Sequence, residues 1–146
     1  MSDYDTDFYT WTEQQAGLLR RRAAGELVNE AELDWSNLAE EIESVGRSER
    51  HEVRNRLAVL LSHLLKWSYQ PERRSGSWNG TIFEQRTQLG QLLEDSPSLR
   101  PFAVAALPKA FVLARMKAEL QTSLLSLPAE CPWTIDQVLS PEFWPD

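Results

Sequence analysis

A run of nine residues near the middle of the chain, LAVLLSHLL from Leu57 to Leu65, constrains the fold more than any other feature. Seven of its nine positions are apolar. Such a run is too continuous for a helix at the surface and too short to cross a bilayer. We therefore expect a central helix that is buried on all sides, with Ser62 and His63 as its only polar residues within the run.

Two helices are expected before the central one. A capping-box spacing over residues 10–13 predicts a helix over about 11–24, and Asp34 can cap the next helix. Gly46 interrupts the periodic pattern, so the central helix either begins afresh near Ser48 or continues the preceding helix through a bend. Of the two, we favour separate helices that meet at an angle. The buried face of the helix after Asp34 is expected to consist of Trp35, Leu38, Ile42 and Val45.

Proline residues divide the second half of the chain. Pro71 ends the central helix at about Tyr69, because proline and the residue before it disfavour helix. Pro108 is expected to separate a short helix from a long final one for the same reason. Three helices are thus expected after Pro71. The first runs from Ser77 or Thr81 to Asp95, the second from Pro97 to Leu107, and the third from after Pro108 to Leu127. The inward face of the last is expected to contain Val112 or Leu113, Met116, Leu120 and Leu124.

The tail after the last helix contains prolines at positions 128, 132, 141 and 145, with room for one helical turn after Thr134. We expect it to wrap the surface, with Trp133, Phe143 and Trp144 as anchors. No run of alternating β-branched residues indicates a strand. The sequence therefore predicts an all-α fold, with residues 1–146 as a single domain. It is a bundle of five to six helices around the buried central helix.

The charge distribution bears on the class of partner. The formal net charge is −7, divided into −8 over residues 1–46, +4 over 47–78 and −3 over the remainder. Such a chain gains little from general attraction to phosphate, which makes nucleic acid a poor partner. The single Cys131 excludes an intramolecular disulfide, and the first residues lack the pattern of a signal peptide. We expect a cytoplasmic protein with no membrane segment.

Glu41 and His63 are the first candidates for a functional site. The spacing from Leu38 and Val45 places Glu41 on the apolar stripe, and His63 shares a face with Trp67. We expect the two to face inward from adjacent helices, with Ser77 and Trp78 as further partners. A raised-pKa acid or base and a satisfied structural group both fit Glu41, and a core histidine is the ordinary interpretation of His63.

Other chemistry has weaker support. The chain has no Glu-x-x-His or His-x-x-x-His spacing, so we expect neither a metal site nor a cofactor. Cys131 lies between Glu130 and Pro132, where an acidic neighbour disfavours the thiolate. A basic row of Arg47, Arg50 and Arg54 could contact phosphates. The acid-first spacings from Glu43 to Arg47 and from Glu52 to Arg56 favour a solvated face that is partly paired with itself.

Six short motifs together resemble a bacterial family described only as a domain of unknown function, number 29. The motifs are Asp-Phe-Tyr-x-Trp (7–11), Asn-Leu-Ala-Glu-Glu-Ile-Glu-Ser (37–44), His-Leu-Leu-Lys-Trp (63–67), Ser-Trp-x-x-Thr-Ile (77–82), Pro-Ser-Leu (97–99) and Cys-Pro-Trp (131–133). The resemblance implies a small helical domain with no established activity. It also implies that Glu41, His63, Trp67, Trp78 and Arg86 meet, as a polar network or a small pocket.

The function we expect is a noncatalytic module that binds a protein partner, since catalytic spacings are absent. Two alternatives stay open. One is a metal-dependent hydrolase or nuclease in which Glu41 and His63 act as base or ligands. The other is nucleic-acid binding through the basic row of Arg47, Arg50 and Arg54.

Overall fold

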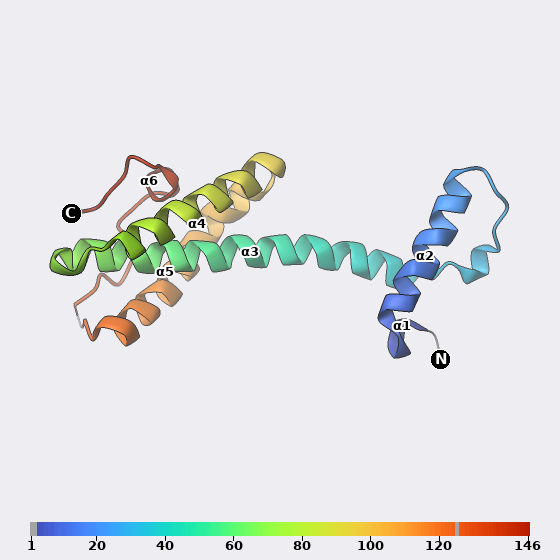
Figure 1. Cartoon of the computed structure of the whole chain (residues 1–146), viewed down its shortest axis with the longest axis horizontal. Helices are drawn as coiled ribbons and strands as arrows, with labels where there is room; N and C mark the ends of the chain where they lie inside the picture. Colours follow the sequence, from blue (N-terminus) through green and yellow to red (C-terminus); the bar gives the residue numbers. More distant parts are fainter. Residues whose placement is uncertain (1–2, 125) are drawn as a thin grey trace. The chain divides into compact units, whose positions relative to one another are not determined.

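The computed structural model describes residues 3–124 and 126–146, and within them every regular element is a helix. The α-helices are α1 (Asp3–Thr6), α2 (Phe8–Ala23), α3 (Trp35–Tyr69), α4 (Gly76–Asp95), α5 (Leu99–Thr122) and α6 (Ile135–Leu139) (Figure 1). Short 3-10 turns lie at Glu30–Glu32 and Pro71–Arg73. The all-α class is confirmed. The chain divides into two compact units, Met1–Arg47 and Ser48–Asp146, and their folding as one domain stays a prediction.

In the first unit, α2 begins earlier than the sequence pattern indicated. Its N-cap is Asp7, whose carboxylate accepts a hydrogen bond from the backbone N–H of Thr10 at 3.1 Å. That bond satisfies one of the free N–H groups of the first turn. The helix ends at Ala23, just before Gly25, which adopts a positive φ of 86°. Trp11 and Gln15 are its buried residues.

The apolar stripe at the start of α3 is not buried, which corrects the expectation for that face. Trp35, Ile42 and Val45 are 56%, 73% and 66% exposed, and Leu38 is half-buried. The covered face carries Asp34, Asn37 and Glu41, which all lie at helical spacing and are all half-buried. Hydrogen bonds explain this choice: Asp34 accepts from Trp11 and Glu41 accepts from Tyr4. Hydrogen bonds to the polar side chains, and not burial of the apolar ones, therefore determine which face of this part of α3 is covered.

The helix does not end at Gly46, contrary to the expectation of a separate helix that starts near Ser48. A single element, α3, runs from Trp35 to Tyr69, and Gly46 keeps a negative φ within it. Glycine in a helix interior costs about 1 kcal/mol relative to alanine, and it ends a helix only where the backbone turns left-handed. The residues on either side of Gly46 therefore keep the helix continuous at this position.

In the second unit, the core is built on the C-terminal part of α3. Leu57, Leu60, Leu61 and Leu64 are fully buried, which confirms the central position of this segment, whereas Trp67 is only partly buried. Helices α4, α5 and α6 lie around it (Figure 1). The N-cap of α4 is Ser75, whose hydroxyl accepts from the N–H of Trp78 at 3.2 Å, so the helix starts before Ser77 or Thr81.

The expected division at Pro108 is wrong, because α5 continues from Leu99 to Thr122 with this proline inside it. An interior proline removes the hydrogen bond to the carbonyl four residues before it, here that of Val104. Both Val104 and Pro108 are exposed. Water can therefore satisfy the free carbonyl, and the helix continues without a buried unpaired group.

The inward face of α5 is also the reverse of the one expected. Val112, Leu113, Met116 and Leu120 are exposed, and Leu124, which follows the helix, is partly buried against the core. The buried face consists of small residues with two large ones, namely Ala103, Ala106, Leu107, Ala110, Phe111, Ala114 and Ala118. Alanine lets a helix approach its neighbours closely, so the aliphatic residues on the opposite side face the solvent.

No helix in the described ranges 3–124 and 126–146 is long and apolar enough to cross a membrane.

Candidate functional site

The residues of the predicted polar network are distributed over both units. Glu41 belongs to the first unit, and His63, Trp67, Ser77, Trp78 and Arg86 belong to the second. The expectation that Glu41 and His63 lie on adjacent helices is wrong, since α3 carries both. Side chains on one helix meet at three- or four-residue spacing, and these two are far beyond it.

Glu41 has its own partner. Its Oε1 accepts a hydrogen bond from the hydroxyl of Tyr4 at 2.6 Å, which connects α1 to α3. The bond to the carboxylate, with some desolvation, raises the pKa of Tyr4 to about 12. A hydroxyl that donates to a carboxylate satisfies it without removing its charge. This geometry fits the interpretation of Glu41 as a structural group whose hydrogen bonds are satisfied.

His63 is half-buried, and its Nδ1 lies 2.9 Å from the carbonyl oxygen of Val59, one turn earlier. A carbonyl only accepts, so Nδ1 carries the proton in this contact. Burial lowers the pKa of His63 below its ordinary value of 6.5, and the charge of Lys66 acts in the same direction. The contact with Val59 opposes them. The side chain is thus held as a neutral imidazole.

This lowered pKa predicts a pH-dependent stability. The folded state disfavours protonated His63, so its contribution is complete above about pH 6.5 and is lost as the pH falls through the folded-state pKa. We expect the free energy of unfolding of the parent to fall relative to that of a His63→Gln variant as the pH decreases below 6.5. Urea unfolding between about pH 5 and 8 measures the difference. The exposed His51, changed to glutamine, is the control and should follow the parent. Parallel curves for the parent and His63→Gln would contradict the prediction.

Trp67 and Arg86 both contact the C-terminal tail, through Trp144. The guanidinium of Arg86 donates to the carbonyl of Val138 at 2.9 Å and to that of Phe143 at 2.7 Å. It also lies 5.4 Å from the ring centre of Trp144, which packs on Trp67 at 4.7 Å. Desolvation by burial lowers the pKa of Arg86. These contacts attach the tail to α3 and α4.

Trp78 contacts a residue outside that cluster. Trp78 has Lys66 over its ring at 5.3 Å, and Lys66 also donates to Gln121 at 2.9 Å. Burial lowers the pKa of Lys66. Ser77 is exposed. The hydrogen bond of His63 goes to Val59 rather than to either predicted partner.

Within the basic row, Arg47 is paired along α3, as its spacing from Glu43 predicted. Arg47 bonds Glu40 at 2.7 Å and lies 3.8 Å from Glu43. The second predicted pair, Arg56 with Glu52, is confirmed at 3.0 Å. The guanidinium groups of Arg50 and Arg54 lie 5.6 Å and 5.9 Å from the ring centre of Phe102. Much of this charge thus has a partner within the protein.

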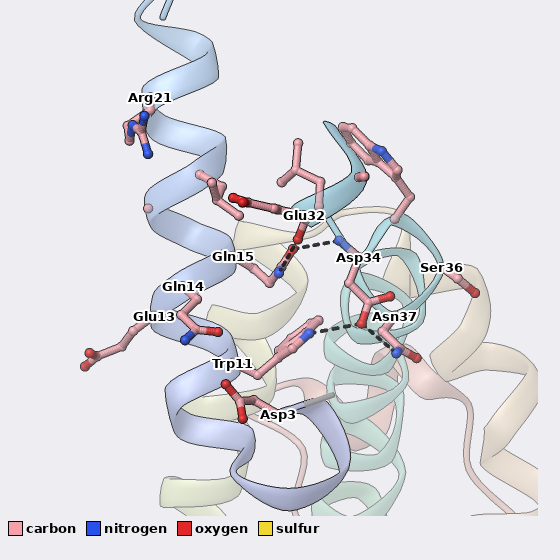
Figure 2. Close-up of a pocket in the computed structure, with 15 residues that line it drawn as sticks. Asp3, Trp11, Glu13, Gln14, Gln15, Arg21, Glu32, Asp34, Ser36 and Asn37 are labelled. Atoms are coloured by element: carbon pink, nitrogen blue, oxygen red, sulfur yellow. Dashed lines mark hydrogen bonds between the residues drawn. The ribbon is translucent and has the colours of Figure 1, made fainter. Parts of the chain in front are cut away.

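A groove lies in the first unit, between α2 and the start of α3 (Figure 2). This groove has a volume of about 1120 Å³. Its walls combine two indoles with carboxylates and amides, and the residues used below are Trp11, Trp35, Glu13, Glu32, Asp34 and Gln15. Trp35 is more than half exposed, so its ring is available to a ligand.

A network of hydrogen bonds holds the walls of the groove together. Gln15, which is 6% exposed, donates to the carbonyl of Glu32 at 3.0 Å and accepts from the N–H of Asp34 at 2.8 Å. The carboxylate of Asp34 accepts from the Trp11 indole at 3.1 Å and from Asn37 at 2.8 Å (Figure 2). The bond from Asn37 lowers the pKa of Asp34, although burial opposes it. The connection between the two helices is therefore fixed by the buried amide.

The groove is acidic. Its lining includes four carboxylates and one cation, Arg21, which pairs with Glu26 at 2.8 Å. The first unit as a whole carries 11 acids against 4 bases, which accounts for the entire net charge of −7. A negative potential disfavours phosphate and attracts cationic groups. The exposed indole ring of Trp35 adds a surface on which a guanidinium or ammonium group can stack.

This groove was not predicted from the sequence. In the sequence patterns, Asp34 is only a helix cap and Trp11 occurs only within the motif of residues 7–11. The motif and the cap did indicate the two residues that anchor the groove, Trp11 and Asp34. Gln15 gave no such indication, because a glutamine on an amphipathic helix ordinarily faces the solvent.

Reactive groups are few in the described ranges. Within residues 3–124 and 126–146, no group of three His, Cys, Asp or Glu side chains is placed to hold a metal ion. Cys131 is half-buried, and its thiol contacts the carbonyl of Trp133 at 3.4 Å. Burial raises the pKa of Cys131, which disfavours the reactive thiolate.

Comparison with known families gives one match. The sequence model described as "Domain of unknown function DUF29" matches residues 4–144. A search of curated proteins and a search of solved structures found no match.

Proposed function

Because the chain belongs to the family described as Domain of unknown function DUF29, its function has to be argued from its own geometry, and we propose a noncatalytic module that binds a basic segment of a protein partner. The groove between α2 and α3 is the binding surface. The observation that carries the proposal is the combination, in that one groove, of an exposed tryptophan with carboxylates in a unit of net charge −7.

Charge complementarity defines the partner. Glu13 and Glu32 are exposed on the two sides of the groove, one on α2 and one in the turn before α3. Arginine or lysine side chains of a partner can approach both. Such attraction increases the rate of encounter and gives specificity, and salt screens it. A volume of about 1120 Å³ exceeds what one side chain fills, which favours a peptide segment over a single cation.

The exposed ring of Trp35 is the expected energetic centre of the contact. Tryptophan and arginine are over-represented among the residues that dominate protein interfaces. A basic segment that also carries apolar side chains can cover this ring and place its cations beside the carboxylates. Because the bonds of Gln15 and Asp34 already fix the walls, binding does not have to order them.

The proposal predicts binding of a short labelled peptide of alternating arginine and leucine, measured by fluorescence anisotropy. The affinity should fall as salt increases from about 50 to 200 mM, because the attraction is screened. Trp35→Ala should weaken binding by about tenfold, as expected for a central aromatic residue. Glu32→Gln should weaken it by a few-fold, since one exposed charge contributes less.

Two substitutions in the second unit are matched controls. Phe83→Ala removes a comparably exposed aromatic side chain, and Glu130→Gln removes an exposed carboxylate. Both should bind as the parent does. A peptide with glutamate in place of arginine should not bind. If the basic peptide does not bind at low salt, or if the controls lose as much affinity as the groove variants, the proposal is wrong.

The two alternative functions stay predictions. For the metal-dependent hydrolase or nuclease, Glu41 and His63 contact separate partners, Tyr4 and Val59. For nucleic-acid binding, Arg47 is paired with acids of its own helix. Neither arrangement favours these functions over the groove.

A further inference from the structure

The outer face of α5 is apolar, although a helix at the surface ordinarily presents polar residues there. Val112, Met116 and Leu120 are 53%, 55% and 86% exposed, and Leu113 lies beside them. Since the opposite face of α5 is buried in the core, this helix is apolar on both sides. Helices of that kind are covered on both sides in stable assemblies, and a contiguous exposed apolar patch marks an interaction surface.

The order of residues along this face is symmetric about the level of Ala114. Val112 and Met116 lie at equal distances on either side, and so do Pro108 and Leu120. The same relation connects Lys109 with Glu119, which have opposite charges. Such a face is self-complementary when the same helix of a second copy packs against it in the antiparallel orientation.

We propose that this face of α5 is the contact between two copies of the chain, packed antiparallel with the two-fold axis near the level of Ala114. In that arrangement Val112 of one copy packs against Met116 of the other, and Lys109 meets Glu119. A contact between two identical patches closes after two copies, as in most soluble homodimers.

The charges select the antiparallel orientation. Lys109 is exposed, and the carboxylate of Glu119 bonds Arg115 through Oε1 at 3.0 Å, which leaves its second oxygen for another cation. A parallel arrangement would instead place Lys109 against Lys109. Like charges at an interface oppose association, so the pattern favours one orientation.

Sedimentation equilibrium of the full chain, from about 1 to 200 µM, tests the proposal, and we expect a monomer–dimer equilibrium there because contacts of one helix face bind in the micromolar range. Met116→Glu should weaken the dimer by about tenfold or more, because it buries an unpaired charge. Phe83→Glu introduces the same charge at a comparably exposed apolar position of α4 and should leave the dimer unchanged. Circular dichroism verifies that both variants fold.

Two charge variants test the orientation. Lys109→Glu and Glu119→Lys should each weaken self-association by a few-fold, because each creates like-charge contacts. Their equimolar mixture restores both opposite-charge contacts and should dimerise as the parent does. A folding defect would not be restored by mixing.

Several results would overturn the proposal. A parent that stays monomeric at the highest concentration would do so, and so would equal losses for Phe83→Glu and Met116→Glu. A mixture that does not recover would show that the dimer uses another geometry. If a monomeric parent binds vesicles of anionic phospholipid and Met116→Glu abolishes this, the face contacts a membrane surface and not a second copy.

Discussion

Leu64→Ala is expected to lower the free energy of unfolding by about 2 to 5 kcal/mol. Leu64 is fully buried on the central segment of α3, within the cluster that contains Phe111 and Leu89. Removing its isobutyl group loses the transfer free energy of the apolar atoms and leaves a cavity that the surroundings fill only in part. Typical domains unfold at a cost of about 5 to 15 kcal/mol, so the change removes a large share of the stability. Urea unfolding followed by circular dichroism measures it.

The matched control is Leu27→Ala in the first unit. Leu27 is 96% exposed, so this change deletes the same atoms from a side chain in solvent and should alter stability by no more than about 0.5 kcal/mol. Similar losses for the two variants would show that Leu64 is not part of a packed core.

Arg86→Met should cost about 2 to 4 kcal/mol, the second largest effect we expect. The guanidinium donates to the carbonyls of Val138 and Phe143, and methionine leaves both without this donor while preserving much of the apolar volume. Hydrogen bonds that involve a charged group contribute about 1.5 to 3 kcal/mol each, and burial of the charge offsets part of this. Urea unfolding gives the free energy of unfolding. A change in tryptophan fluorescence emission would report loss of the contact between Trp144 and Trp67, and hence detachment of the tail.

Two further variants separate this role from a general loss of charge. Arg86→Lys keeps the charge but cannot reach two carbonyls with one planar group, so it should rescue little of the stability. Arg100→Met removes an exposed guanidinium that pairs with Asp136 on the surface and should cost no more than about 1 kcal/mol. The assignment fails if Arg86→Met costs no more than Arg100→Met.

The central helix could be predicted from the sequence because a run such as Leu57 to Leu65 leaves no polar face to expose. The limits of α2 and α4 were harder to place. Several residues in each region can act as caps, and the structure selects Asp7 and Ser75, whose side chains accept from the first turn.

The two faces predicted wrongly, on α3 and α5, share a physical cause. Hydropathy ranks valine, leucine and methionine above alanine, and any apolar residue above aspartate or glutamate. On α5 the distance to the neighbouring helices decides instead, so Ala110 and Ala114 are buried and Met116 is not. On the first part of α3, hydrogen bonds to Asp34 and Glu41 decide. Neither effect can be read from the periodicity of one helix.

The candidate site was predictable only in its anchor points. Trp11 and Asp34 belong to patterns that the sequence displays, a motif and a cap. The groove between them exists because the amide of Gln15 bonds two backbone groups near the start of α3, a contact over 17 to 19 positions in the chain. Glu41 and His63 lie on one helix and not on two adjacent ones, because Gly46 does not end the helix.

The division of charge between the two units has a consequence for colloidal behaviour. Residues 48–146 carry 11 acids and 11 bases, so the second unit has no formal net charge near neutral pH. A body near its isoelectric point lacks the mutual repulsion that keeps proteins dispersed, and this one also presents the apolar face of α5. The repulsion between molecules comes from the acidic first unit. The carboxylates of the first unit, four of which line the groove, therefore also supply the net charge that favours solubility of the whole protein.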